Sequence, residues 1–259
     1  MKPMRYAVCC VPVSPLRIER SHKTEMISQL LFGECCLILE TTGDGWMNVQ
    51  CKHDNYRGWC QNTHFVEIDE DHYVRCNEDL TSEWVSEIDY NGHHMFVPLG
   101  SSLTSLQNGR AFWRKSTIHY SGQVWRPSEV SITPKLIKQL IYKFLNTSYL
   151  WGGRSVYGID CSGLCQVVFK FLNFPIQRDA WQQAGEGNTV SFLQEAKCGD
   201  LAFFDNDEGK IIHVGILLNE HELIHSSGKV RIDKIDNQGI VNIETKQRTH
   251  KLRIIKRYF

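Results

Sequence analysis

The chain has 259 residues, of which 42% are hydrophobic and 22% charged, and its formal net charge is zero. The length allows one large domain or two to three small ones. The neutral balance argues against binding to nucleic acid or to an anionic membrane, because such surfaces show an excess of basic residues. No apolar run approaches the length of a transmembrane helix. We expect a globular protein without a nucleic-acid or membrane partner, and a monomer.

The first residues, 1–13, combine basic side chains with a short apolar run. This run is too short and too interrupted by proline for a signal peptide, and its alternation is typical of a strand. The start therefore favours a cytoplasmic protein. An export signal removed from the natural chain is the alternative.

Ten cysteines are present, but none form a Cys-x-x-Cys pair. A zinc site would need such closely spaced ligands, and the nearest candidate pair, His221 and His225, has no cysteine nearby. We therefore expect reduced, mostly buried thiols, no metal and no cofactor.

Residues 1–69 show short apolar stretches separated by turn residues, a pattern that predicts a small β-barrel. A longer polar connection, residues 14–29, is predicted to be a surface loop and contains Glu25. Loops of this length are often functional. The expected strands are Tyr6–Val13, Leu30–Glu40, Trp46–Cys51, Arg57–Cys60 and Phe65–Ile68.

Residues 70–125 show a fainter version of the same pattern, with strand-like runs near residues 84–87, 95–98 and 115–120. We predict a second, degenerate barrel, which serves either as a spacer or as a packing module.

Residues 126–259 open with a helix that Thr133 can cap, and Pro134 suits its first turn. A second helical pattern follows Cys161, with a buried face formed by Leu164, Val167, Val168, Phe171 and Leu172. Cys161 then lies at the start of a helix, where unpaired N–H groups and the helix dipole favour the thiolate. We therefore predict a cysteine nucleophile, whereas Cys165 is expected to be an inert core thiol.

Two strands are predicted downstream, at residues 199–205 and 210–218, and a third at 222–227. His213 is a polar residue in an otherwise apolar strand, and His225 is expected roughly opposite it. Cys161, His213 and His225 would act as nucleophile, base and orienting group. A terminal strand at residues 252–258 would complete an α+β fold, in which the nucleophile helix packs on an antiparallel sheet.

Five motifs in this order resemble the NlpC/P60 family of papain-like cysteine peptidases. They are Tyr-x-Trp-Gly-Gly from Tyr149, Gly-x-Asp-Cys-Ser-Gly-Leu around Cys161, Gly-Asp-Leu-x-Phe-Phe from Gly199, His-Val-Gly-Ile from His213 and Ile-His-Ser-Ser-Gly around His225. Three further stretches, residues 31–34, 45–49 and 56–60, resemble a bacterial SH3-like domain. The implied architecture is two SH3-like barrels followed by a papain-like catalytic domain.

Members of this family cleave peptidoglycan stem peptides, commonly between γ-D-glutamate and the diamino acid that follows. The chain most resembles the dipeptidyl-peptidase group, which acts on free murein tri- or tetrapeptides and reads their terminal L-alanine amine. The residues that match this group's substrate-binding positions are Glu25, Tyr56, Tyr149, Trp151, Asp160, Ser162 and Asp179. The resemblance thus implies a recycling enzyme that releases L-Ala-γ-D-Glu.

Three alternatives remain open. An acyl- or amide-transfer enzyme could use the same cysteine and histidines. An exported endopeptidase could act on intact peptidoglycan, with the SH3-like domains as wall-binding modules. A catalytically inactive binding module is the third. The sequence leaves open whether the third stem residue is diaminopimelate or lysine.

Overall fold

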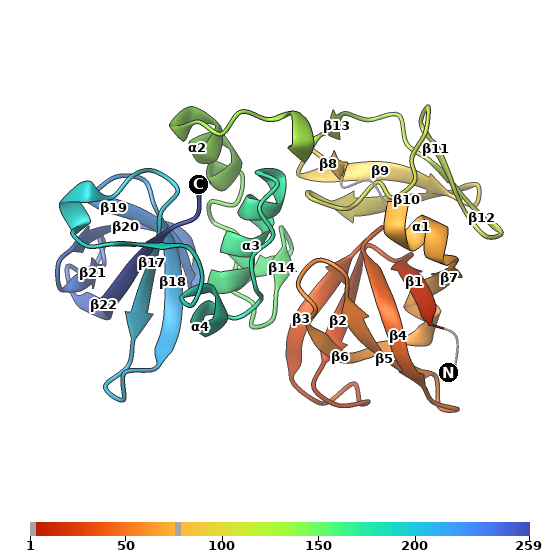
Figure 1. The fold of residues 1–259 in the computed structure, drawn as a ribbon, viewed down its shortest axis with the longest axis horizontal. Helices are drawn as coiled ribbons and strands as arrows, with labels where there is room; N and C mark the ends of the chain where they lie inside the picture. Colours follow the sequence, from red (N-terminus) through yellow and green to blue (C-terminus); the bar gives the residue numbers. More distant parts are fainter. Residues whose placement is uncertain (1–3, 76–78) are drawn as a thin grey trace. The chain divides into compact units, whose positions relative to one another are not determined.

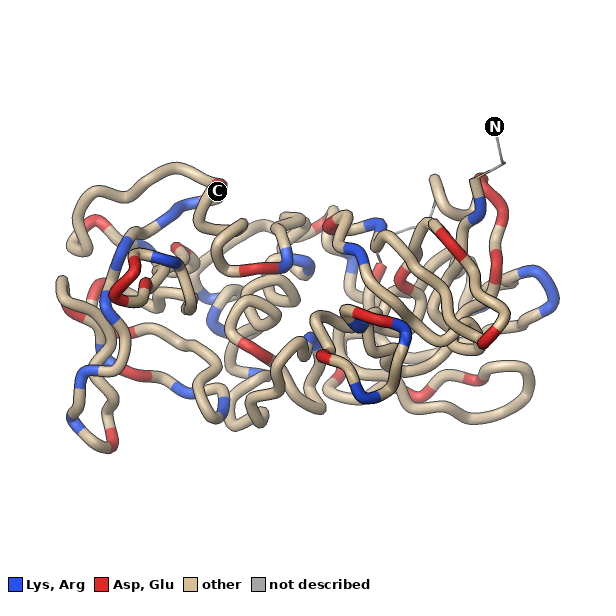
Figure 2. Tube along the Cα trace, turned by 90° about the horizontal axis from the view of Figure 1, so that it is seen from below, with Lys and Arg blue, Asp and Glu red and all other residues tan. Residues whose placement is uncertain are grey.

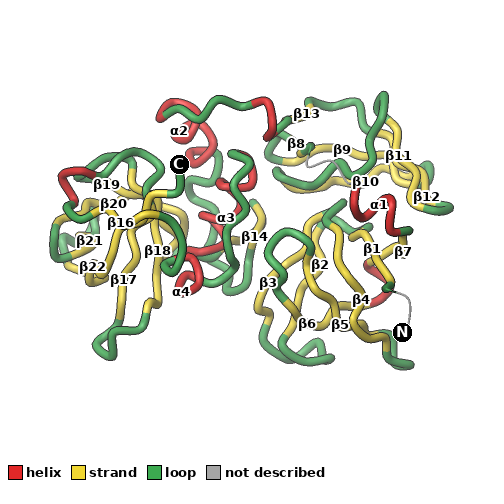
Figure 3. The backbone as a smooth tube through the Cα atoms, in the orientation of Figure 1, coloured by secondary structure: helices red, strands yellow, loops and turns green. Residues whose placement is uncertain are grey.

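The structure is a computed structural model that describes residues 4–75 and 79–259. Contacts divide the chain into two compact units: unit 1 comprises Met1–Val130 and Trp151–Val156, and unit 2 comprises Ser131–Leu150 and Tyr157–Phe259. Strands predominate over short helices (Figure 3). Residues 1–3, on which the signal-peptide expectation partly rests, and Cys76 lie outside the described residues. The division into domains at 1–69, 70–125 and 126–259 stays a prediction.

The first part of unit 1 is a seven-stranded antiparallel sheet of order β3-β2-β6-β5-β4-β1-β7 (Figure 1). Alternate side chains of its strands point inward and form an apolar core that includes Leu16, Leu30 and Val49. The elements are β1 (Arg5–Cys9), β2 (Val13–Arg17), β3 (Met26–Leu31), β4 (Cys35–Thr41), β5 (Trp46–Cys51), β6 (Arg57–Gln61), the 3-10 helix η1 (Asn62–His64), β7 (Phe65–Ile68) and α1 (Glu70–Arg75).

The expected surface loop at residues 14–29 is wrong, because β2 and β3 form an antiparallel hairpin there. Leu16 and Leu30 are fully buried in the core. Polar residues in these strands, such as Gln29, obscure the alternation in the sequence. Only the short turn between the strands remains a loop, and it ends at Glu25, directly before β3.

The second part of unit 1 is a four-stranded antiparallel sheet of order β10-β9-β12-β11 with a separate β8–β13 pair. Its core residues, among them Trp113 and Ile118, pack in one cluster with Phe32 and Cys35 from the first part. A second SH3-like barrel is therefore not shown by this sheet. The elements are β8 (Leu80–Thr81), β9 (Val85–Tyr90), β10 (His93–Pro98), β11 (Arg110–Trp113), β12 (Ser116–His119), β13 (Val124–Trp125) and the 3-10 helix η2 (Pro127–Glu129).

Unit 2 contains a seven-stranded sheet of order β16-β22-β17-β18-β19-β20-β21, in which β22 also pairs with β21. The strands of this sheet are β16 (Asn188–Val190), β17 (Leu201–Asp205), β18 (Ile211–Leu217), β19 (Glu222–Ser227), β20 (Lys229–Asp236), β21 (Gly239–Val241) and β22 (Arg248–Arg257). The short strand β15 (Gly158–Ile159) lies outside the sheet. The helices are α2 (Pro134–Tyr142), α3 (Cys161–Phe171), α4 (Ala180–Gln183) and the 3-10 helix η3 (Leu193–Glu195), whereas β14 (Arg154–Ser155) belongs to unit 1.

The sequence correctly predicted the first helix of unit 2 and most of its last strand. The Thr133 side chain accepts the N–H of Leu136 and caps α2, as expected. Strand β22 includes most of the predicted terminal strand and joins β16, β17 and β21. Helix α3 packs against β18 and β19 (Figure 1). The result is the expected α+β arrangement of a helix on an antiparallel sheet.

Positive and negative residues are interspersed along the trace (Figure 2), in keeping with the zero net charge. Among the described residues, no helix is both long enough and apolar enough to cross a membrane.

Candidate active site

Cys161 is the first residue of α3. Asp160 precedes it as the helix cap, and its Oδ1 accepts the Gly163 N–H at 2.7 Å. The apolar face predicted behind the cysteine is buried, including Leu164 and Val168. Capping and burial of this face together explain why a helix begins at this residue. The nucleophile candidate is thereby held on a rigid element.

The environment of the Cys161 thiol differs from the expectation of a stabilised thiolate. Burial raises the pKa of the Cys161 thiol to about 12, and the Asp160 charge adds to this effect. The backbone N–H groups of Val214 and Ser162 lower the pKa but do not outweigh burial. The resting thiol is therefore neutral, and a base must remove its proton when it reacts.

His213 lies in β18, next to the Val214 backbone that contacts the Cys161 sulfur. The His213 side chain is buried, and its Nε2 lies 2.8 Å from Nδ1 of His225 in β19. Burial lowers the pKa of His213 well below its usual value, and His225 and His250 lower it further. The structure thus brings the three predicted catalytic residues into one site, with a neutral imidazole as the available base.

Two residues of this site have no counterpart in the sequence-based prediction. Asp233 in β20 lies 3.0 Å, through Oδ2, from Nε2 of His225. His250 in β22 stacks on His213 with ring centroids 4.2 Å apart. The register of β20 with β19 is unbroken, so Asp233 lies on the opposite face of the strand from Val230, and both residues are buried. An alternation with one buried face, counted from Val230, would not have identified Asp233.

Asp160 and Ser162, predicted to bind substrate, share one buried partner. Arg178 donates from Nη2 to Asp160 Oδ2 at 2.6 Å and from Nη1 to Ser162 Oγ at 2.8 Å. Asp179 follows it and precedes α4, where its N–H donates to Gln182 Oε1 at 3.1 Å. The sequence prediction missed Arg178. Its only signal was a basic residue beside a candidate site aspartate.

Tyr149 is another of the residues predicted to bind substrate. Its backbone N–H donates to the Gly228 carbonyl at 3.0 Å. Burial raises the pKa of its hydroxyl to about 12, and the charges of Cys161 and Asp160 act in the same direction. The hydroxyl is therefore protonated at neutral pH and able to donate a hydrogen bond.

Glu25, Trp151 and Tyr56 belong to unit 1. The Trp151 Nε1–H donates to Glu25 Oε1 at 2.6 Å, and the indole is 60% exposed. Tyr56 packs against the core of the first sheet. Glu25 and Trp151, although 126 residues apart in the chain, are thus brought into direct contact.

The segment Trp151–Val156 is fixed to unit 1 by Arg154. Its guanidinium is fully buried and lies 3.0 Å and 3.2 Å from the two carboxylate oxygens of Glu34. It also donates to the Gln29 carbonyl at 2.6 Å. A buried pair of this kind fixes geometry even where it adds little net stability. The segment that leads to Cys161 is therefore held by β3 and the turn after it.

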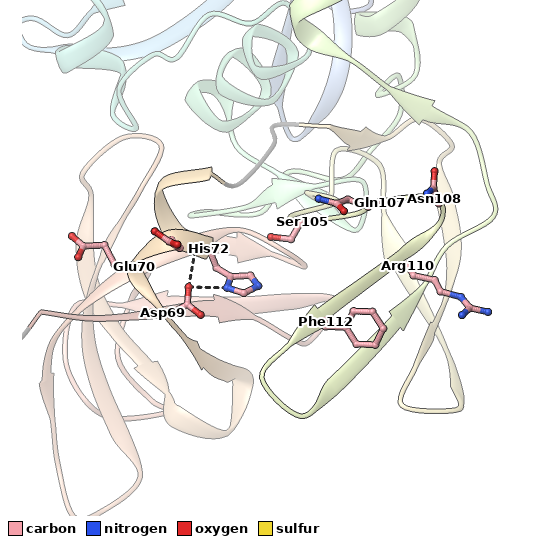
Figure 4. A pocket seen from close by; sticks show the side chains of 9 residues that line it. Asp69, Glu70, His72, Ser105, Gln107, Asn108, Arg110 and Phe112 are labelled. Atoms are coloured by element: carbon pink, nitrogen blue, oxygen red, sulfur yellow. Dashed lines mark hydrogen bonds and ion pairs between the residues drawn. The ribbon is translucent and has the colours of Figure 1, made fainter.

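A pocket of about 850 Å³ lies in unit 1, beside α1 and β11 (Figure 4). Its lining residues are Asp69, Glu70, Asp71, His72, Ser105, Gln107, Asn108, Arg110 and Phe112. Asp69 Oδ1 accepts the His72 N–H and lies 2.8 Å from its Nδ1. The pocket contains none of the sequence-predicted site residues.

Comparison with known proteins identifies the family of the chain. Residues 146–249 match the model of the NlpC/P60 family, and residues 16–65 match that of the bacterial dipeptidyl-peptidase Sh3 domain. A γ-D-glutamyl-L-lysine dipeptidyl-peptidase of Bacillus subtilis (strain 168) is 31% identical over 216 residues, covering 77% of this chain and 71% of the relative. Dipeptidyl-peptidase 6 of Lysinibacillus sphaericus is 21% identical over 90% of this chain and 92% of the relative.

Among solved structures, an NlpC/P60 family protein from Bacillus cereus ATCC 10987 superposes with a TM-score of 0.80. The match covers 98% of this chain and 99% of the other, at 18% sequence identity. At this identity the likeness concerns the fold alone.

Proposed function

Because the chain belongs to the NlpC/P60 family of cysteine peptidases, we propose that it hydrolyses the γ-D-glutamyl–diamino acid bond of free murein peptides. Its substrate is a tri- or tetrapeptide with an unblocked N-terminal L-alanine, and its product is L-Ala-γ-D-Glu. The single observation that carries this proposal is the hydrogen bond from the Trp151 Nε1–H to the Glu25 carboxylate, because it joins two of the residues proposed to bind the substrate. The match to a dipeptidyl-peptidase Sh3 domain supports it.

The catalytic step follows from the neutral resting site. His213 takes the thiol proton, and Cys161 attacks the carbonyl carbon of the γ-amide. Backbone N–H at the start of α3 and the Tyr149 hydroxyl stabilise the oxyanion. The imidazolium then protonates the leaving amine, and water hydrolyses the thioester with His213 again as the base. His225 orients His213 throughout.

Recognition of the amine requires an anionic group that binds an ammonium. Glu25 is exposed at the end of the β2–β3 turn, and the Trp151 indole donates a hydrogen bond to it. This donor fixes the carboxylate without neutralising its charge, so that it remains available to a cation. Tyr56, Asp160, Ser162 and Asp179 complete the proposed substrate-binding set.

The proposed setting is the recycling of wall peptides in the cytoplasm by a monomer. A recycling enzyme must spare chains whose amine is blocked, whereas an endopeptidase for intact peptidoglycan must accept them. The amine is therefore the feature that separates these two functions.

The experiment compares L-Ala-γ-D-Glu-diaminopimelate, its lysine analogue and their N-acetylated forms, with products identified by mass spectrometry. We expect the free peptides to be cleaved and the acetylated ones to react at least about 100-fold more slowly. Glu25→Gln should raise KM for the free peptides about 10- to 100-fold. This is the loss of affinity expected when one hydrogen bond between charged groups is removed. Glu19→Gln, in the same turn, is the matched control.

Cleavage of the acetylated peptides at a comparable rate would make the protein an endopeptidase. Product formation only in the presence of an added amine would make it a transferase. Cys161→Ala serves as the blank in every arm.

A further inference from the structure

Asp233 lies behind the histidine pair and is as buried as the residues that it supports. Its side chain is 2% exposed and that of His225 is 1% exposed. Three groups approach its carboxylate: His225 Nε2 at 3.0 Å from Oδ2, the Ile243 N–H at 2.8 Å from Oδ1, and Arg231 Nη2 at 3.1 Å from Oδ1. All three are donors or can be donors, which favours the ionised carboxylate.

The ionisation state of Asp233 follows from this balance. Burial alone would raise the pKa of the carboxyl group, but the hydrogen bonds from His225, Ile243 and Arg231 outweigh burial and lower it below its usual value. Asp233 therefore carries no proton at neutral pH and can only accept hydrogen bonds.

An acceptor at this position dictates where the proton of His225 lies. Its Nε2 faces the carboxylate and must carry the hydrogen. In a neutral imidazole the other nitrogen, Nδ1, is then an acceptor. His213 Nε2 lies 2.8 Å from this Nδ1 and must therefore be a donor. The proton of neutral His213 is thus on Nε2, and the lone pair of the base is on Nδ1.

We propose that Asp233 is a positioning residue that fixes the tautomer of His225 and, through His225, the tautomer of His213. Nδ1 of His213 is then unprotonated and can accept the proton of the Cys161 thiol. The inference rests on His213 being the base, as in the proposed function. During the reaction the thiol proton moves to His213 Nδ1 and then to the leaving amine. No proton moves to Asp233. Its charge stabilises the imidazolium through the ring of His225.

Asparagine at this position makes a sharp test, because the carboxylate's other donors decide how the amide lies. The Ile243 N–H and Arg231 Nη2 both donate to Oδ1, whereas Arg231 Nε lies 3.0 Å from Oδ2 without forming a hydrogen bond. Asp233→Asn keeps these bonds only with its oxygen there, and its NH₂ group then faces His225 Nε2. His225 would carry its proton on Nδ1, and so in turn would His213. The thiol would meet an N–H instead of a lone pair.

Asp233→Ala removes the carboxylate without imposing the wrong tautomer. We therefore expect kcat to fall about 10-fold in Asp233→Ala and about 10³-fold in Asp233→Asn, with KM changed less than about threefold in both. For comparison, imposing the wrong histidine tautomer in a serine-protease triad lowers kcat about 10⁴-fold. A merely structural role predicts the opposite order, because asparagine is the closer replacement in shape.

The direct readout is the histidine tautomer, measured without substrate from ¹⁵N shifts of ¹⁵N-histidine-labelled full-length protein at pH 7. His225→Gln and His250→Gln provide the assignments. Wild type should show His213 and His225 protonated at Nε2, and Asp233→Asn should show both protonated at Nδ1. Asp236→Asn is the matched control, because Asp236 is on the same strand and pairs with Arg248. It should leave both tautomers and kcat unchanged.

The inference is overturned if wild-type His213 carries its proton on Nδ1, if Asp233→Asn keeps both Nε2–H tautomers, or if Asp233→Asn is as active as Asp233→Ala. Melting curves of the variants identify those that fail to fold, and the wild-type tautomers still decide the question in that case. If wild type hydrolyses no murein peptide, the proposed function fails, while the tautomer measurement still tests the role of Asp233.

Discussion

Arg178 forms a buried, bidentate ion pair with Asp160, the residue before the nucleophile, with N–O distances of 2.6 Å and 3.1 Å. The same carboxylate caps α3 through the Gly163 N–H. The charge that starts the helix of Cys161 is therefore held in place by a residue that lies 18 positions away. Loss of this support should affect both folding and the position of the thiol.

The first prediction concerns the stability of this pair. Arg178→Met should lower the free energy of unfolding by about 3–5 kcal/mol, because Asp160 is then left buried without its partner. Urea denaturation at pH 7 measures the change. The double variant Arg178→Met/Asp160→Asn should recover part of the loss, since no charge is left unpaired. A loss below about 1 kcal/mol for Arg178→Met would contradict a supporting role.

The second prediction ranks the catalytic residues. Cys161→Ala should abolish hydrolysis, and His213→Ala should lower kcat by at least about 10⁴-fold, because no other group takes the thiol proton. His225→Gln should lower kcat less, by about 10²-fold, because it orients rather than reacts. Steady-state kinetics on L-Ala-γ-D-Glu-L-Lys measures the ranking. Equal losses for His225→Gln and His213→Ala would refute the assignment of roles.

Much of this site follows from local sequence rules. A capping aspartate, a cysteine and an apolar helical face together predicted where α3 begins. Polar His213 in an apolar strand predicted an inward-facing base. The residues that support these groups, Arg178 and Asp233, could not be predicted by such local rules, because their roles depend on tertiary contacts. Arg178 reaches back to Asp160, and Asp233 faces His225 because it lies on the same face of β20 as Arg231, the residue paired with His225.

In the fold, too, local patterns predicted some elements, whereas elements that depend on tertiary contacts were missed. Trp46–Cys51 and Phe65–Ile68 were predicted to the residue, because apolar side chains alternate with turns on either side. The β2–β3 hairpin was missed, since its buried positions include Ser14 and Gln29 as well as leucines. Buried polar residues are satisfied by partners that lie far apart in the sequence: Ser14 Oγ lies 3.0 Å from His64 Nδ1. Hydrophobic periodicity cannot detect such partners.

The third prediction concerns the pH dependence of stability. Burial lowers the pKa of His250 to about 4, and the neighbouring His225 also lowers it, against a smaller opposing effect of Asp233. Between pH 6.5 and pH 4 the unfolded chain binds a proton at this histidine and the folded protein does not. Stability should therefore fall as pH falls through this window, and His213 adds to the effect.

The comparison of variants isolates the His250 contribution. Free energies of unfolding from urea titrations at pH 7, 6 and 5 should fall less steeply in His250→Gln than in wild type. His221→Gln provides the control, because His221 is 79% exposed. Parallel curves for wild type and His250→Gln would show that this imidazole does not titrate differently in the folded protein.

The last prediction concerns the donor that holds Glu25. Trp151→Phe keeps an aromatic ring in the exposed position but removes the Nε1–H that lies 2.6 Å from Glu25 Oε1. Without this hydrogen bond the carboxylate is free to sample other rotamers, and binding of the substrate ammonium must order it again. We expect KM for the free peptide to rise about 3- to 10-fold, less than in Glu25→Gln because the carboxylate itself is kept, with kcat within about twofold.

Trp181→Phe is the matched control, because Trp181 is equally exposed, at 63%, and lies in α4. It should leave KM near the wild-type value. Trp151→Phe in a Glu25→Gln background should add little to the loss, since the two residues act through one carboxylate. Fully additive losses in this double-mutant cycle would mean that Trp151 contacts the substrate by itself rather than through Glu25.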